Sequence, residues 1–299
     1  MPRHKPFRPF LDMIYRGIPD ASWKTGETSI GELVSERGSA RLFLGHYTED
    51  DIRAAYKRFS IQERLDELGL GHYRIHIDAA NPDAQELKLF PVVSDSSAYR
   101  SGIDDEPIAE VILREANLSP AEHFLKNAES RPYLVIQWIC LQNPLAKFDP
   151  KNLLPGQRYP GLGVGHKVLK VLDALIHTLH LEGIVNRPEF LHAAIMYSMV
   201  FQFVNPEAQG RLNALRRDLA ALDLWQIAWA SENGHILEDG VKTRFTWFQS
   251  EQVWTSCDEM VRYFESDTYK IRARETEKKA AYAISPGAPD EFKPGRRQG

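Results

Sequence analysis

Residues 133–185 hold a nearly continuous apolar run, a glycine-rich loop, an amphipathic helical pattern and a second short apolar run. The first run, Tyr133 to Leu141, is typical of a strand buried on both faces. The helical pattern spans 166–181, and the apolar segment Gly183-Ile184-Val185 follows it. A buried strand, a loop and an amphipathic helix in this order favour a crossover connection. We therefore expect residues 106–204 to form a mixed sheet with helix 166–181 packed on one face.

Periodic patterns on either side predict further elements of the same fold class. An N-cap and an acidic first turn at 48–51 open a helical pattern that runs from Ile52 to Leu68. Residues 72–78 and 86–93 alternate with a period of two around an Asn-Pro-Asp turn, which predicts a hairpin. The other expected elements are a strand at 108–114, a helix opening at Ser119-Pro120-Ala121-Glu122, helices near 189–199, 207–221 and 255–265, and aromatic strands near 225–230 and 244–249. Together they predict an α/β (mixed α+β) fold with a central mixed sheet flanked by helices.

The chain divides into three regions. Residues 1–105 supply an N-terminal helix and strand region that we expect to be continuous with the core, and 106–268 supply the core with a C-terminal extension. The last region, 269–299, is expected to be a disordered tail. From Ile271 onward it is charged, rich in Pro and Gly, and poor in apolar residues.

The segment from Leu154 to His166 carries the main functional signal. Its alternating glycines let the backbone approach a ligand and point successive N–H groups inward, while the start of the following helix adds a partial positive charge. These features suit a pyrophosphate. The segment is not a Walker loop, because no Gly-Lys-Ser/Thr ends it, and it is not the dinucleotide fingerprint, because His166 stands where the third glycine should be. The alternative is a tight strand-to-helix connection with no ligand.

The pattern Arg158-x-x-Gly161-x-Gly163, with Gly165 and a helix behind it, resembles the acyl-CoA pyrophosphate loop of the GNAT superfamily of N-acetyltransferases. The resemblance covers about residues 106–204. It implies a GNAT-like sheet and acyl-CoA, such as acetyl-CoA, as co-substrate. The residues that it implies bind this cofactor are Gln157, Arg158, Gly161, Leu162, Gly163, Val164, Gly165 and His166. The chain departs from the family in an insertion at 142–153, in Pro160, and in a very short fifth strand before Pro188.

The same resemblance implies a base, an acid and an oxyanion donor. Tyr197 stands where the family places its acid, and a phenol with a pKa of about 10 suits proton donation to a thiolate. Glu110, an acid within an apolar strand, is the first candidate base, because burial would raise its pKa. His192 is the second candidate base, and the oxyanion donor would be a backbone N–H of strand 133–141. A core tyrosine, a solvent-facing glutamate and a structural histidine are the respective alternatives.

Composition argues against several other functions. A net charge of −4 and a pI near 6.2 give no basic field for nucleic acid or an anionic membrane. Cys140 and Cys257 match no zinc spacing, and His177 and His180 lack a third ligand, so no metal is expected. The sequence shows no signal peptide and no apolar run of about 18 residues, which predicts a cytoplasmic protein.

The leading hypothesis is therefore an N-acyltransferase that moves an acyl group from acyl-CoA to a small-molecule or peptide amine. Two alternatives stay open at this point. One is a binding or regulatory protein that keeps the fold without catalysis. The other is a different enzyme that uses the glycine-rich loop for a nucleotide or a phosphorylated ligand.

Overall fold

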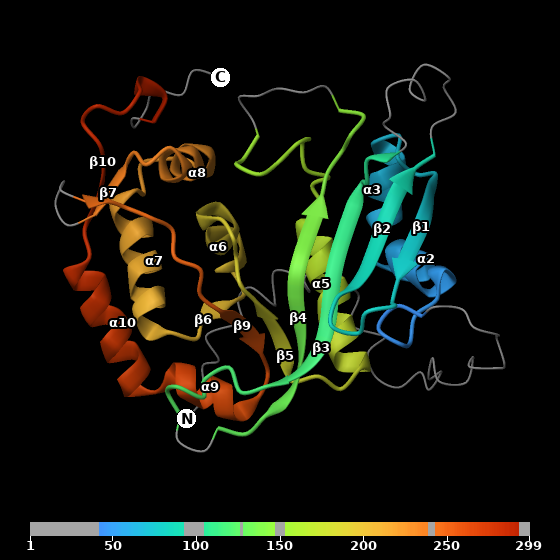
Figure 1. Ribbon diagram of the computed structural model, residues 1–299, viewed down its shortest axis with the longest axis horizontal. Coiled ribbons are helices and arrows are strands. Elements are labelled where there is room, and N and C mark those ends of the chain that lie inside the picture. The colour runs from blue at the N-terminus through green and yellow to red at the C-terminus, as the bar shows by residue number, and fades with distance from the viewer. Residues whose placement is uncertain (1–41, 93–104, 126–127, 147–152, 239–242, 293–299) are drawn as a thin grey trace, which may run out of the picture.

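The computed structural model describes residues 42–92, 105–125, 128–146, 153–238 and 243–292. Within these residues a seven-stranded mixed sheet forms the centre, in the order β1-β2-β3-β4-β5-β9-β6 (Figure 1). Its strands are β1 (Tyr73–Asp78), β2 (Gln85–Pro91), β3 (Ala109–Leu118), β4 (Arg131–Leu141), β5 (Gly183–Asn186), β6 (Gln202–Phe203) and β9 (Gln252–Thr255). All neighbours pair antiparallel except β4 and β5, which pair parallel. The predicted mixed α+β fold is confirmed, and so is the hairpin, as β1 and β2.

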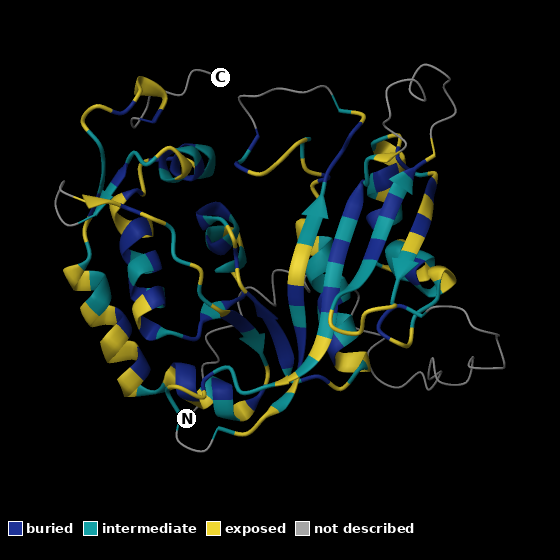
Figure 2. Cartoon of the chain, in the orientation of Figure 1, coloured by how far each residue is buried: buried dark blue, intermediate teal, exposed yellow. Residues whose placement is uncertain are grey.

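The helices α2 (Glu49–Arg58), α3 (Ile61–Glu67) and α5 (Gly165–Thr178) cover one face of strands β1 to β4 (Figure 1). Alternate residues of these strands, such as Leu89, Val111 and Leu113, are buried against the helices. The residues between them remain partly or fully exposed on the opposite face (Figure 2). Helix α5 connects β4 to β5, which is the crossover predicted from the order of the elements.

The pattern from Ile52 to Leu68 forms two helices instead of one. Thr48 and Asp51 build the expected capping box at the start of α2. Ser60 then adopts a left-handed conformation with φ 57°, which ends the first helix and redirects the chain into α3. Lys167 of α5 donates a hydrogen bond to the Ser60 carbonyl at 2.6 Å. This corner is therefore tied to the start of α5.

The C-terminal part of the chain builds a second hydrophobic cluster beside the sheet. Its helices are α6 (Leu191–Tyr197), α7 (Pro206–Asp218) and α8 (Leu224–Glu232), with a short helical turn at Asp290–Phe292. Helices α9 (Asp258–Glu265) and α10 (Asp267–Lys279) bury their aromatic residues in a third cluster, against strands β4, β5 and β9. A small sheet in the order β10-β7-β8 joins the second cluster, with β7 (Ile236–Glu238), β8 (Thr243–Arg244) and β10 (Tyr282–Ile284). The cluster centres on Leu212, Leu215 and Phe245.

Three predicted elements differ from the structure. The expected strand at 225–230 is helix α8, because Asp223 and Gln226 form a capping box and the aromatic residues recur at helical spacing. The expected helix after Ser119 is a turn over 120–124, and the Ser119 hydroxyl bonds the Ala128 carbonyl in place of a helix cap. The expected strand at 244–249 is only the two-residue β8.

The prediction of a disordered tail from 269 onward is wrong for residues 269–292. Helix α10 packs along α7, and Tyr269, Tyr282 and Phe292 are buried. The tail has few apolar residues, but its aromatic ones are packed: Tyr269 contacts Tyr263 and Phe264 of α9, and Tyr282 and Phe292 join the cluster around α7 and α8. The predictions for residues 1–41 and 293–299 fall outside the described residues.

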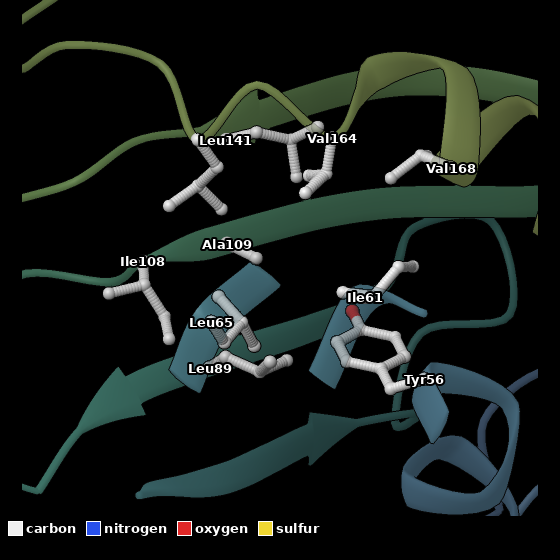
Figure 3. Close-up of a pocket in the computed structure, with 10 residues that line it drawn as sticks. Tyr56, Ile61, Leu65, Leu89, Ile108, Ala109, Leu141, Val164 and Val168 are labelled. Atoms are coloured by element: carbon white, nitrogen blue, oxygen red, sulfur yellow. The ribbon is translucent and has the colours of Figure 1, made fainter. Parts of the chain in front are cut away.

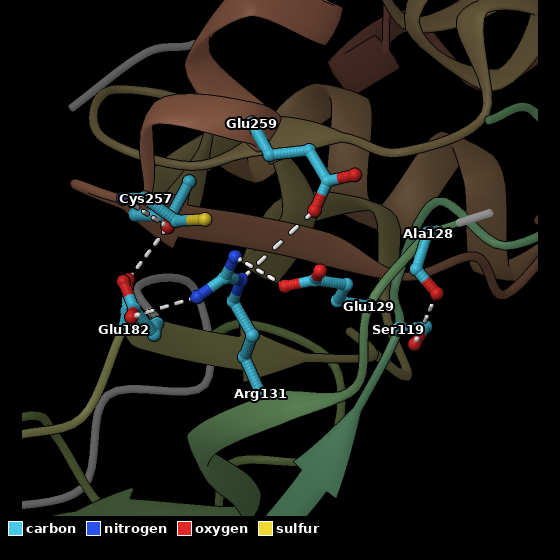
Figure 4. A network of polar contacts seen from close by, with 8 residues as sticks. Ser119, Ala128, Glu129, Arg131, Glu182, Cys257 and Glu259 are labelled. Carbon is cyan, nitrogen blue, oxygen red and sulfur yellow. Dashed lines mark hydrogen bonds and ion pairs between the residues drawn. The ribbon is translucent and has the colours of Figure 1, made fainter. Parts of the chain in front are cut away.

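A polar network ties the β4–β5 pair together at the end opposite to the C-termini of the strands (Figure 4). The Arg131 guanidinium lies 2.7 Å from the Glu129 carboxylate, 3.7 Å from that of Glu182 and 4.0 Å from that of Glu259. Thr255 adds a hydrogen bond to the Glu182 carbonyl. The network joins the start of β4, the residue before β5 and helix α9.

No helix among the described residues is both long enough and apolar enough to cross a lipid bilayer.

Candidate functional site

Strands β4 and β5 pair over three residues and then separate. Leu134 pairs with Ile184, Val135 with Val185, and Ile136 with Asn186. Strand β5 ends at Asn186, whereas β4 continues to Leu141. In the described part of the chain, no strand pairs with the β5 side of residues 137–141. The separation leaves an open backbone edge at the C-terminal ends of two parallel strands, where α/β sheets commonly bind ligands.

A β-bulge in β4 coincides with this separation. On the β3 side Leu113 pairs with Ile136, but Ile112 pairs with Trp138, so Gln137 has no partner residue. A bulge of this kind leaves one residue outside the ladder and redirects the strand. The bulge therefore releases the backbone of Gln137 where the open edge begins.

The open edge presents backbone groups of alternate residues. The Gln142 N–H donates to the Ile108 carbonyl at the β3 side. Because successive residues of an antiparallel strand point their N–H and C=O groups to opposite sides, those of Ile139 and Leu141 face the open edge. An extended ligand that carries amide groups can pair with such an edge.

The loop between β4 and α5 closes over the end of this edge. The Asn143 N–H donates to the Pro160 carbonyl at 2.7 Å, and Gly161 bridges Gln142. Leu162 and Val164 are buried in the core, while Gly161, Gly163 and Gly165, which alternate with them, are exposed. Two buried anchors therefore hold a backbone whose glycines face outward.

The loop leads into an N-terminus of α5 that carries no side-chain cap. Val164 occupies the N-cap position without a side-chain hydrogen bond, and the first turn has no acidic residue. Burial lowers the pKa of His166, and the positive charges of Lys167 and Lys170 lower it further. The amides, the helix dipole and these cations together favour an anion at this position.

Arg64 of α3 adds a cation that the sequence pattern did not indicate. Its Nε donates to the Leu162 carbonyl at 3.2 Å, and a Cβ at Gly163 would lie 3.7 Å from its Nη2 atom. Arg64 also pairs with Glu67 at 2.8 Å, and the predicted side chains of the loop are engaged as well. Arg158 pairs with Glu106 at 2.8 Å, and the Gln157 side chain accepts a bond from the Leu154 N–H. An anion at the loop has to compete with Glu106 for Arg158.

Asn186 and Gln252 form a second feature that the sequence pattern did not indicate, at the point where β4 and β5 part. The two residues are cross-strand partners in β5 and β9, and their exposed fractions are 3% and 0%. The Nδ2 and Oδ1 atoms of Asn186 and the Oε1 atom of Gln252 are buried without a hydrogen-bond partner. Buried polar atoms are rarely left unpaired unless a ligand or a water completes them.

The candidate acid and the second candidate base both lie on α6. Tyr197 packs edge-on against Phe201, with ring centroids 5.6 Å apart, and burial raises the pKa of its phenol. His192 stacks on Phe190 at 5.3 Å, and burial lowers the pKa of its imidazole to about 4. An imidazole with this pKa is neutral at pH 7 but is a weak base.

Glu110 lies on the open face of the sheet and is fully engaged there. Its carboxylate accepts a hydrogen bond from the Trp138 indole at 2.9 Å and pairs with Lys88 at 2.9 Å. Burial alone would lower the pKa of Lys88, but the hydrogen bonds to Glu110 and Glu86 outweigh it and raise that pKa. Cys140 is the cross-strand partner of Glu110. Burial, and next the Glu110 charge, raise the pKa of this thiol.

The structure brings the loop residues 161–166 together at the start of α5, and it places Gln157 and Arg158 on the same loop. It does not join the candidate acid and base: Tyr197 packs against the cluster on the helix-covered face, whereas Glu110 belongs to the opposite row of β3. No hydrogen bond links the two side chains within the described residues.

A small cavity beneath the loop is apolar (Figure 3). It is lined by Tyr56, Ile61, Leu65, Leu89, Ile108, Ala109, Leu141, Leu162, Val164 and Val168. Tyr56 alone among these brings a polar side-chain atom. Such a lining cannot hold a phosphate, so this cavity is a gap in the packing of α2, α3, α5 and the sheet, on the core side of Leu141, Leu162 and Val164.

In the described part of the chain, no three His, Cys, Asp or Glu side chains gather in a group that could hold a metal ion. No protein-family model matches the chain, and no curated protein matches it significantly.

Proposed function

We propose that the protein is an acyl-CoA-dependent N-acyltransferase that acylates a small-molecule or peptide amine. The observation that carries the proposal is the combination of an open, bulged β4 edge with an uncapped, glycine-lined start of α5 at its end. A CoA thioester has the matching parts, because its pyrophosphate is an anion and its pantetheine arm is an extended chain with two amides. The resemblance to GNAT acetyltransferases supports the same assignment.

The parts of the ligand are assigned by chemistry. The pyrophosphate binds the exposed amides at Gly161 to Gly165, with Arg64 and the helix dipole as counter-charges. The arm runs along the edge of β4 and pairs with the backbone of Leu141 and Ile139. The thioester then reaches the bulge at Gln137, whose unpaired backbone stabilises the oxyanion.

The transfer requires two proton movements. The amine nitrogen attacks the thioester carbonyl, a C–N bond forms, the C–S bond breaks, and the thiolate leaves. Tyr197 is the group proposed to protonate the thiolate. Glu110 lies on the opposite face of β3, so the amine is proposed to attack in its neutral form and to release its proton to water after the C–N bond forms.

A non-catalytic acyl-CoA-binding protein is the second candidate function. Two observations favour it: Glu110 is held by an ion pair and a hydrogen bond, and His192 is too weak a base at pH 7. Both candidates predict acyl-CoA binding, and only the first predicts transfer.

The test is calorimetric titration of acetyl-CoA into the wild-type chain and into Gly165→Val. A Cβ at Gly165 would meet no other atom within 4 Å, and the glycine has no left-handed φ, so the valine should leave the fold intact and fill the space of the phosphates. Gly287→Val is the matched control, because that glycine is equally open and is not part of the loop. We expect Gly165→Val alone to lose binding, and equal affinity in all three chains would refute the loop assignment.

Turnover with an amine panel then separates the two functions. An enzyme should form amide product, and Tyr197→Phe should lower its kcat by about 10²-fold or more while acetyl-CoA affinity changes little. Binding without product for any amine would favour the second candidate.

A further inference from the structure

The side-chain amide of Asn186 and the amide oxygen of Gln252 lack hydrogen-bond partners within the fold. Three buried atoms are unpaired, namely Nδ2 and Oδ1 of Asn186 and Oε1 of Gln252. The Gln252 Nε2 atom donates to the Ala194 carbonyl at 3.3 Å, which fixes the orientation of that amide. Both polar atoms of Asn186 are unpaired, so the assignment of its nitrogen and oxygen does not alter the count. A buried donor and acceptor left open are costly to the fold.

Asn186 occupies a particular position in the sheet. It is the last residue of β5, and it pairs with Ile136, the residue directly before the bulged Gln137. The unpaired amide therefore lies at the carboxyl end of the parallel pair, beside the edge from which β4 continues alone. Its cross-strand partner Gln252 bonds the Ala194 carbonyl, so the two amides lie on the face of the sheet that α6 covers, and a ligand that turns from the edge toward α6 at the bulge would contact them.

The open atoms require a ligand that both donates and accepts hydrogen bonds. Phosphate and thioester oxygens only accept, whereas a secondary amide offers an N–H and a C=O. The pantetheine arm of a CoA thioester carries two such amides. We infer that Asn186, with Gln252 behind it, binds an amide of the pantetheine arm and so positions the thioester at the bulge; this inference rests on the proposed function.

The test compares Asn186→Leu with the wild-type chain, using acetyl-CoA and ADP as probes. ADP has the pyrophosphate but no arm, so it reports on the loop alone. We expect the leucine variant to melt about 2–4 °C higher without ligand, since an unpaired buried amide is removed. We expect it to bind acetyl-CoA about 10-fold more weakly and ADP unchanged.

Gln226→Leu is the matched control, because Gln226 is equally buried but its amide bonds the Glu291 carbonyl and the Asp223 N–H. This variant should melt lower than the wild-type chain and keep the affinity for both probes. If Asn186→Leu does not fold, Asn186→Ala is measured with the same expected loss for acetyl-CoA alone.

The outcomes distinguish this inference from the proposed function. If the wild-type chain binds acetyl-CoA and the Asn186 variants bind it equally well, the role of Asn186 is refuted and the proposed function stands. A lower melting temperature with unchanged acetyl-CoA affinity would make the amide a structural group that an internal water completes. If the wild-type chain does not bind acetyl-CoA, the proposed function fails, and the inference fails with it.

Discussion

At the scale of single residues, His192 shows how burial sets a chemical property that the sequence alone does not reveal. The sequence marks it as a histidine on an apolar helix, which fits either a base or a packed side chain. In the fold it is 8% exposed and stacks on Phe190. Burial lowers its pKa from 6.5 to about 4, so the imidazole is neutral in the folded protein at neutral pH.

This shift predicts a pH dependence of stability. Between the folded pKa of about 4 and the unfolded value of 6.5, the unfolded chain binds a proton that the folded chain does not, so stability falls as the pH falls. From about pH 7.5 to about pH 5, we expect His192 to cost about 2 kcal/mol of unfolding free energy. Urea unfolding at both pH values measures it. His192→Gln should lose less stability than the wild-type chain by that amount, and an identical loss in the two chains would refute the assignment.

The glycine loop could be predicted at this scale, whereas Arg64 and Asn186 could not. The loop signal is local, because Gly161, Gly163 and Gly165 act through their own backbone. Arg64 reaches Leu162 across 98 positions of sequence. The open amide of Asn186 depends on where β5 ends and on which residue of β9 lies beside it. Only the folded arrangement supplies those facts.

At the scale of elements, periodicity predicted the strands and helices that carry clear two-residue or helical patterns. It predicted β1, β2, β3, β4 and α5. It failed for segments whose structure is determined by capping residues or by packing against another helix. Residues 225–230 are aromatic, which favours strand, but the Asp223 capping box and the packing against α6 make them helical. Helix α10 was missed because its single apolar face is narrow.

The contact between α7 and α10 gives a prediction at this scale. A Cβ at Gly210 would lie 2.3 Å from the Ala273 carbonyl oxygen and 2.7 Å from the Thr276 Cβ, so the glycine lets the two helices approach closely. Alanine in the middle of a helix usually stabilises it. Here we expect Gly210→Ala to destabilise the chain by about 1–3 kcal/mol, because the helices must move apart.

Thermal or urea unfolding checks this expectation, with Gly165→Ala as the control at an open position. The control should be neutral or slightly stabilising. A Gly210→Ala variant as stable as the wild-type chain would mean that α10 does not pack on α7 as described.

At the scale of the whole molecule, strands β4 and β5 are held together at their N-terminal ends and separate at their C-terminal ends. The Arg131 network and the three β4–β5 pairs hold the strands together near their starts. Beyond the bulge at Gln137 the strands part, and the loop before α5 closes over the end of the open edge. The sequence indicated the loop and a very short fifth strand before Pro188, but it did not indicate the bulge at Gln137, beyond which β4 continues alone.

Hydrogen exchange at β4, measured with and without acetyl-CoA, tests most directly whether the β4 edge binds the pantetheine arm. The N–H groups of Ile139 and Leu141 face the open edge, whereas those of Trp138 and Cys140 face β3, as the Gln142 bond to Ile108 indicates. Acetyl-CoA should slow exchange at Ile139 and Leu141 and leave Trp138 and Cys140 unchanged, and ADP should protect neither pair. Unchanged exchange at Ile139 and Leu141 under saturating acetyl-CoA would contradict the claim that the β4 edge binds the pantetheine arm.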